Sequence, residues 1–327
     1  MRIGEYQTGQ VFNIDCIEGM RQMPSGVVDL VVADPPYWKV VGEKWDYQWR
    51  TEEDYIQWCL EWFSEVSRVL RTGGTFYCFG YFRTLALLVP HLSSFGFDLR
   101  QQIIIDKGMK SVSGRATKKY KMFPNTTESV LFIIKDNKPF IKPFLKGKQA
   151  EVGLSAKQIN DALGVKSNGG GMWSIYTGKN ICEQFPTKEL WTKLAAILQF
   201  DLPYEKLAQT FNPQMGITDV WDDIDFYEEE RFHPTQKPIK LIKRLILASS
   251  NRGDVVLDPF MGAGSTLIAS NDLGRECLGF ESDEHFCNVA NLRANGQPIL
   301  AKSSTKKNIK RKKEDPTFDN VLFAEQT

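Results

Sequence analysis

The stretch that decides the fold reads Val255-Val256-Leu257-Asp258-Pro259-Phe260-Met261-Gly262-Ala263-Gly264-Ser265-Thr266. Its apolar start predicts a buried strand, its glycines predict a tight turn, and a helix should begin at its end. Gly262 and Gly264 let the backbone approach a ligand closely, and Ser265 or Thr266 can cap the helix. A second apolar run, residues 276–280, ends at Glu281. A carboxylate about 20 positions after such a loop can accept hydrogen bonds from a ribose.

Another predicted strand, residues 27–33, ends in Asp34-Pro35-Pro36-Tyr37. In open α/β sheets the carboxyl end of a strand is where ligands bind. The carboxylate can accept a hydrogen bond from an exocyclic amine, the prolines fix the backbone, and the tyrosine ring offers a face for a flat base. Alone, Asp-Pro-Pro would more often be a plain turn after a strand. The glycine loop and Glu281 favour instead a site that transfers a group onto an amine.

Together these motifs resemble the DNA amino-methyltransferases, which methylate adenine N6 or cytosine N4 with S-adenosylmethionine. The tetrapeptide comes first in the chain and the glycine loop last, an order that looks like the permuted beta class of the family. Two more segments carry the resemblance, namely Asp15-Cys16-Ile17-Glu18-Gly19-Met20 and His233-Pro234-Thr235-Gln236-Lys237-Pro238. The resemblance implies an α/β fold with a Rossmann-like, mostly parallel sheet and an inserted helical target-recognition region.

The resemblance also implies a role for each matching residue. Asp34 would accept a hydrogen bond from the amine of a base flipped out of the duplex, and Tyr37 would stack on that base. Asp15 would accept from the adenine of the cofactor, Glu281 from its ribose, and Lys237 would pair with its methionine carboxylate. The expected catalytic residues are Asp34, Pro35, Pro36 and Tyr37. The expected cofactor-binding residues are Asp15, Asp34, Thr235, Gln236, Lys237, Asp258, Phe260, Gly262, Gly264, Ser265, Thr266 and Glu281.

Composition limits the class of protein further. With 327 residues the chain is long enough for a full α/β domain and an insertion. The net charge is only +1, so positive charge for binding nucleic acid must be local. Neither a Cys-x-x-Cys pair nor clustered histidines occur in the sequence, and no metal is expected. Without an apolar signal region or a stretch of about 18 apolar residues, we expect a cytoplasmic protein. The resemblance implies a bacterial or phage origin.

The order of predicted elements divides the chain into four parts. Residues 1–145 would form the catalytic half of the methyltransferase domain, 146–232 the helical target-recognition insertion, 233–299 the cofactor-binding half, and 300–327 a basic, disordered tail. Further strands are predicted at residues 75–79, 103–105 and 129–134. Helices are predicted at residues 52–70, 85–92, 155–163, 187–198, 204–211, 239–249, 266–273 and 283–295.

A basic loop is predicted between two strands, at residues 107–121. Its Arg115, Lys118 and Lys119 are expected to contact DNA phosphates, so that neutralising them weakens binding and flattens its salt dependence. The alternative is a solvated surface loop. The lysines of the tail could add nonspecific attraction to phosphates.

Four functions compete. Asp rather than Ser at position 34 favours adenine N6 as the target, and cytosine N4 stays open. Methylation of RNA or of a protein glutamine is disfavoured, since those enzymes more often carry Asn-Pro-Pro-Tyr and place the cofactor loop first. A noncatalytic DNA-binding regulator is disfavoured by the two intact motifs. Double-stranded DNA is the expected partner; a homodimer and a cognate restriction endonuclease are both compatible with the sequence, as is a solitary enzyme.

Overall fold

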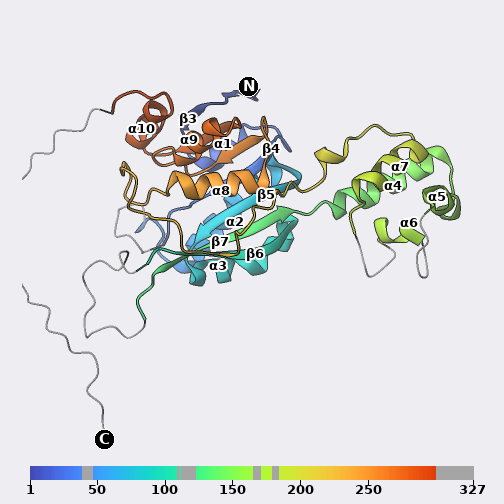
Figure 1. Ribbon diagram of the computed structural model, residues 1–327, viewed down its shortest axis with the longest axis horizontal. Helices are drawn as coiled ribbons and strands as arrows, with labels where there is room; N and C mark the ends of the chain where they lie inside the picture. The colour runs from blue at the N-terminus through green and yellow to red at the C-terminus, as the bar shows by residue number, and fades with distance from the viewer. Residues whose placement is uncertain (39–46, 109–110, 112–122, 165–170, 179–183, 300–327) are drawn as a thin grey trace, which may run out of the picture.

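The computed structural model describes residues 1–38, 47–108, 111, 123–164, 171–178 and 184–299 (Figure 1). Its centre is a mixed, mostly parallel eight-stranded sheet. In spatial order the strands are β3 (Gln10–Asn13), β10 (Glu276–Glu281), β9 (Val255–Asp258), β4 (Val28–Ala33), β5 (Leu70–Gly80), β7 (Thr127–Lys135), β6 (Phe97–Asp106) and β8 (Val220–Trp221). A separate two-stranded hairpin, β1 (Arg2–Ile3) and β2 (Tyr6–Gln7), lies near the N-terminus.

The direction of the strands places the site. Strands β3, β10, β9, β4 and β5 run parallel to one another, whereas β7 is antiparallel to both β5 and β6. Because β7 is reversed, its first residues lie at the edge where the parallel strands end. The predicted strands are all present, although β5 and β6 are longer than their apolar runs indicated.

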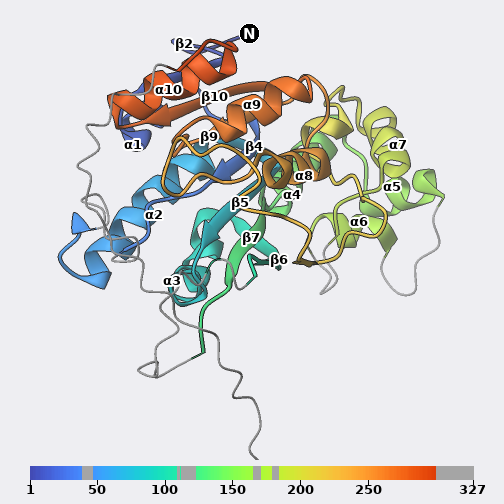
Figure 2. The ribbon, with the colours of Figure 1, turned by 60° about the vertical axis from the view of Figure 1, so that its left-hand side comes forward.

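Helices cover both faces of the sheet, and alternate residues of β4 show how. Val31 and Ala33 belong to one apolar core, and Leu30 and Val32 belong to the other. The first core also contains side chains of α1 (Cys16–Arg21), α2 (Glu52–Val69) and α3 (Phe82–Leu88). The second contains side chains of α8 (Ile239–Ser249), α9 (Ser265–Asp272) and α10 (Glu284–Ala294). In Figure 2, α2 and α3 lie on one side of the strands, and α8 and α9 lie on the other.

Helix α2 illustrates how local sequence fixes an element. Thr51 caps its start, and the side chain of Asp54 returns a hydrogen bond to the cap, a reciprocal capping box. Its apolar side chains recur at helical spacing, and both Trp62 and Phe63 are fully buried. Each such aromatic side chain contributes roughly 2–3 kcal/mol by leaving water. The predicted helix over 52–70 is therefore confirmed, and the packed face is structural.

The helical part lies apart from the sheet (Figure 1) and has a core of its own. Its helices are α4 (Lys138–Val152), α5 (Ala156–Leu163), α6 (Gly171–Tyr176) and α7 (Lys188–Leu198). The core consists of Ile141, Leu145, Ile159, Leu163, Trp173, Tyr176, Trp191, Leu194, Leu198 and Leu207. Because α4 begins at Lys138 and contributes to this core, the boundary predicted at residue 146 falls inside a helix.

Two helix predictions need correction. In place of a helix over 204–211 there is one 3-10 turn, Tyr204–Lys206. The carbonyls of Leu207 and Ala208 instead accept side-chain hydrogen bonds from Asn137 and Arg71, which tie this segment to the start of α4 and to the start of β5. In the second case, the helix predicted at 85–92 is α3 followed by a 3-10 segment, Val89–Phe95, which has a proline near its start.

Candidate active site

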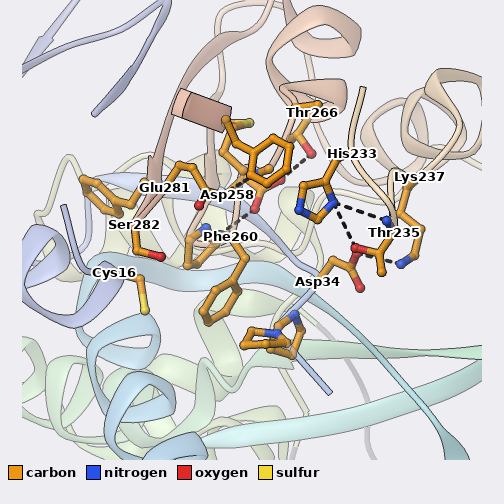
Figure 3. Close-up of a pocket in the computed structure, with 18 of the residues that line it drawn as sticks. Cys16, Asp34, His233, Thr235, Lys237, Asp258, Phe260, Thr266, Glu281 and Ser282 are labelled. Carbon is orange, nitrogen blue, oxygen red and sulfur yellow. Dashed lines mark hydrogen bonds and ion pairs between the residues drawn. The ribbon is translucent and has the colours of Figure 1, made fainter. Parts of the chain in front are cut away.

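A cavity of about 430 Å³ lies at the carboxyl ends of β4, β9 and β10 (Figure 3). Its walls combine three segments that are distant in sequence: the tetrapeptide after β4, the glycine loop after β9 and the segment before α8. Every residue predicted to act in catalysis or in cofactor binding lines this cavity, except Gly264. These segments lie close together because the parallel strands that precede them end at the same edge of the sheet.

The tetrapeptide is held by hydrogen bonds at both ends. The hydroxyl of Tyr37 lies 2.8 Å from Asp34 Oδ1, and the hydroxyl of Tyr55 donates to the carbonyl of Pro36 at 3.1 Å. Tyr37 is only 7% exposed, and its ring packs edge-on against Tyr81. The side chain of Asp34 remains 20% exposed toward the cavity. The carboxylate is thus fixed in orientation and still open to a ligand.

Lys237 lies beside this carboxylate. Its Nζ is 2.6 Å from Asp34 Oδ2 and 3.0 Å from Glu128 Oε1, and the lysine side chain is 7% exposed. The sequence predicted that Lys237 pairs with the methionine carboxylate of a cofactor. In this structure its ammonium is instead engaged by two protein carboxylates.

Glu128 was missed by the sequence analysis. It is the second residue of β7, its side chain is 5% exposed, and its Oε1 also lies 2.8 Å from the Tyr37 hydroxyl. Lys107 Nζ lies 3.7 Å from Oε2 of the same carboxylate. The sequence did show a charged residue directly before the predicted strand 129–134. Placing that residue near the cavity, however, required knowing that β7 runs antiparallel to its neighbours.

These charges shift one another's proton affinities. Burial raises the pKa of Asp34, and the neighbouring Glu128 adds to the rise, while Lys237 opposes it. Burial alone would raise the pKa of Glu128, but the charges of Lys237 and Lys107 hold it below its usual range. Burial works to lower the pKa of Lys237, yet Asp34 and Glu128 keep it above its ordinary value. At neutral pH the lysine is therefore charged, and of the two carboxylates Asp34 is the one whose proton affinity is raised.

The glycine loop has the backbone that the sequence predicted. Gly262 and Gly264 adopt positive φ values of 52° and 88°, and a Cβ on Gly264 would lie 2.9 Å from the Cβ of Ala290. Gly262 keeps the loop open at the cavity, whereas Gly264 allows close packing on α10. The predicted caps are wrong: α9 begins after Gly264 without a side-chain cap. The hydroxyl of Ser265 donates instead to the carbonyl of Lys237 at 2.8 Å.

Asp258, at the end of β9, is a buried carboxyl of the cavity wall. Its oxygens accept hydrogen bonds from the Thr266 hydroxyl at 2.5 Å and from the Phe260 amide at 2.9 Å. Burial raises the pKa of Asp258 to about 7. These bonds hold the glycine loop closed against β9.

Two carboxylates predicted to bind the cofactor also stabilise local backbone. Glu281 accepts from the amides of Gly262 and Asp283, both at 2.8 Å. Asp15 accepts from the Ile17 amide at 2.9 Å and so caps α1. A carboxylate has about four acceptor positions, so both side chains retain capacity for a ligand.

The segment before α8 is ordered by its own side chains. His233 Nδ1 lies 3.1 Å from the Thr235 hydroxyl, and Gln236 accepts from the Phe232 amide at 2.9 Å. Burial and the charge of Lys237 lower the pKa of His233 to about 4. The imidazole is therefore neutral at physiological pH and serves as an acceptor.

Some predicted residues cannot be placed. Arg115, Lys118 and Lys119, and the whole tail 300–327, lie outside the residues that the structure describes. Within the described ranges, no group of three or more His, Cys, Asp or Glu side chains could hold a metal ion, and no helix is long and apolar enough to cross a membrane.

Comparison with known proteins shows the family of the chain. Residues 28–292 match the N6/N4 methyltransferase family, described as DNA methylase, and the chain belongs to this family. It is 27% identical over 282 residues to the DNA adenine methyltransferase YhdJ of Escherichia coli strain K12, a match that covers 83% of this chain and 78% of that protein. It is 25% identical over 293 residues to the type II methyltransferase M.HinfI of Haemophilus influenzae.

The match to M.HinfI covers 85% of this chain and 66% of that protein. A crystal structure of the M1.HpyAVI-SAM complex superposes with a TM-score of 0.53 at 19% identity, covering 88% of this chain and 98% of that one. At this identity the likeness concerns the fold. The α/β fold with its mixed, mostly parallel sheet is therefore shared with DNA methyltransferases.

Proposed function

We propose that the protein transfers a methyl group from S-adenosylmethionine to the N6 amine of an adenine flipped out of double-stranded DNA. The observation that carries this proposal is the cavity itself. The carboxylate of Asp34, whose side chain is 20% exposed, faces the same cavity as the glycine loop and Glu281. A hydrogen-bond acceptor for the target amine and a set of groups suited to binding a nucleoside thus lie in one cavity.

The donor set fits this cofactor. Gly262 exposes backbone at the cavity, Glu281 offers acceptors for ribose hydroxyls, and Asp15 offers one for an adenine amine. When bound, the cofactor supplies an electrophilic methyl group. The protein's contribution is alignment of the reacting atoms, which can account for roughly 7 kcal/mol or more of the barrier.

Asp34 acts on the target amine. Its carboxylate accepts a hydrogen bond from the amine, together with the backbone carbonyl of Pro35, and draws the nitrogen toward a tetrahedral geometry. The same carboxylate takes the surplus proton once the nitrogen is methylated. The ring of Tyr37 stacks on the extruded base and offsets part of the few kcal/mol that flipping costs.

Adenine is favoured over cytosine by Asp at position 34 and by the likeness to YhdJ, whose name describes an adenine methyltransferase. Cytosine N4 is the alternative target. We further infer that residues 138–207 form the inserted region that recognises the DNA sequence, since they have a core of their own. Arg115, Lys118 and Lys119 are proposed to contact the DNA phosphates. A homodimer and a cognate restriction endonuclease are compatible with this function.

The test is transfer of radiolabelled methyl from S-adenosylmethionine to unmethylated DNA. Asp34→Asn should reduce the rate at least 100-fold, because the general base is lost. Asp98→Asn is a matched control, since Asp98 forms an exposed ion pair with Arg100 on β6. Equal rates for Asp34→Asn and the control would refute the role of Asp34.

A further inference from the structure

Four side chains form a closed ring of hydrogen bonds, and three of them, Asp34, Tyr37 and Lys237, line the cavity. The Tyr37 hydroxyl lies 2.8 Å from both Asp34 Oδ1 and Glu128 Oε1. Lys237 Nζ closes the ring, at 2.6 Å from Asp34 Oδ2 and 3.0 Å from Glu128 Oε1. Glu128 therefore touches both of the groups that hold Asp34.

The ring contains two carboxylates but only one tyrosine hydroxyl proton and one ammonium to satisfy them. A tyrosine hydroxyl has a single hydrogen, so Tyr37 can donate to Asp34 or to Glu128 but not to both at once. Lys237 balances one negative charge, and Lys107, 3.7 Å from Glu128 Oε2, partly balances the second. The charge of Asp34 in turn adds to the rise in the pKa of Asp258, a buried carboxyl on β9.

Glu128 is a second buried carboxylate beside Lys237. It occupies the second position of β7, shortly before the apolar residues 130–134, and Asp34 alone would suffice as a counterion for Lys237. A second buried carboxylate costs free energy of desolvation unless it gains comparable interactions. Glu128 affects Asp34, because the two carboxylates share the hydroxyl of Tyr37 and the ammonium of Lys237.

We propose that Glu128 is a positioning residue of the methyl transfer, which fixes the Tyr37 ring and keeps Asp34 basic by competing for Lys237. The inference rests on the proposed function. In the transfer, the amine nitrogen forms a bond to the methyl carbon while the carbon–sulfur bond breaks and its electron pair stays on sulfur. The surplus proton then passes from the nitrogen to Asp34. Stronger proton affinity at Asp34 speeds this last movement.

The direction of the pKa shifts agrees with this role. Glu128 raises the pKa of Asp34, and Lys237 lowers it. Without the charge of Glu128, the ammonium would act on Asp34 alone, and the pKa of Asp34 would fall. Removal of Lys107 should do the opposite, since Glu128 would then draw more strongly on Lys237.

The experiment is the single-turnover rate of methyl transfer to DNA between pH 5 and 8, at saturating cofactor. Glu128→Gln keeps the size and one acceptor oxygen but removes the charge. We expect the midpoint of the acidic limb to move to lower pH and the plateau rate to fall at least threefold. Lys107→Met should move the midpoint up. The control Glu65→Gln removes a charge 17% exposed and paired with Arg68 on α2, and should leave the profile unchanged.

The outcomes separate the two proposals. If the wild-type protein methylates no DNA, the proposed function fails. If the wild-type protein is active and the Glu128→Gln profile superimposes on it, the inference about Glu128 is wrong. Circular dichroism establishes that each variant is folded. Should Glu128→Gln not fold, Lys107→Met decides alone, and an unmoved midpoint in that variant overturns the inference.

Discussion

Replacement of Lys237 by methionine should produce a large and pH-dependent loss of stability. The change removes an ammonium that lies 2.6 Å from Asp34 and 3.0 Å from Glu128, whose side chains are 20% and 5% exposed. Breaking a buried ion pair by removing one partner costs about 3–5 kcal/mol. The isolated carboxylates would lower this cost by binding a proton.

Proton uptake sets the pH dependence of that loss. Protonating a carboxyl of ordinary pKa near 4.3 costs about 1.4 kcal/mol for each pH unit above that value. The ceiling on the destabilisation is therefore about 5 kcal/mol at pH 8 and about 2 kcal/mol at pH 5.5. The folded variant of Lys237 binds a proton that the unfolded chain releases, so its stability falls as the pH rises.

The assay is urea unfolding followed by circular dichroism at pH 5.5 and pH 8, with the wild-type protein measured at each pH. Lys243→Met is the matched control, because Lys243 lies on the same helix, α8, and forms an exposed 2.7 Å pair with Asp272. That control should lose less than about 1 kcal/mol. A Lys237→Met variant within about 1 kcal/mol of wild type at both pH values, on the scale of such exposed pairs, would refute the buried-ring account.

Three other changes test other parts of the site. Burial raises the pKa of Asp258 to about 7. The stability that its protonated form contributes is fully present below pH 4 and is lost as the pH rises through 7. Asp258→Asn should therefore flatten the fall in Tm over that range, as measured by calorimetry. Gly264→Ala should cost about 2–4 kcal/mol in urea unfolding, since the residue has φ 88° and its Cβ would meet Ala290 at 2.9 Å. Glu281→Ala should weaken S-adenosylmethionine binding about 10–100-fold in titration calorimetry, because charged hydrogen bonds to the ribose are lost.

Each of these has a result that would contradict it. An unchanged pH profile of Tm in Asp258→Asn would mean that Asp258 is ionised in the folded protein. A Gly264→Ala variant as stable as wild type would show that the loop and α10 can move apart. Glu276→Ala, at the exposed start of the same strand, is the control for Glu281→Ala, and equal cofactor affinities in both would remove Glu281 from the binding site.

Local patterns were sufficient to predict much of the fold. The helix over 239–249 is α8, and the strand, glycine turn and helix around residues 255–272 are present, because hydrophobic periodicity and glycine at positive φ act within a few residues. The failure at residues 204–211 has a nonlocal cause. There, Arg71 and Asn137 capture backbone carbonyls that a helix would have used.

The residues that line the cavity could be predicted from the sequence, but several of their hydrogen-bond and ion-pair partners could not. Asp34 and the glycine loop could be brought together because parallel strands end at one edge of a sheet. The partners of Lys237 could not, since Glu128 enters from a reversed strand, and nothing in a single sequence fixes that direction. Thr266 shows the same limit: its hydroxyl bonds Asp258 rather than capping α9. Such pairings depend on tertiary packing.

The most direct measurement is mass spectrometry of nucleosides from unmethylated DNA after incubation with the purified protein and S-adenosylmethionine. The account predicts N6-methyladenine, absent when Asp34→Asn replaces the wild-type protein. N4-methylcytosine would retain the fold and the roles of the cavity but overturn adenine as the target. No modified base on DNA of varied sequence would contradict the central claim that Asp34 presents a DNA amine for methylation.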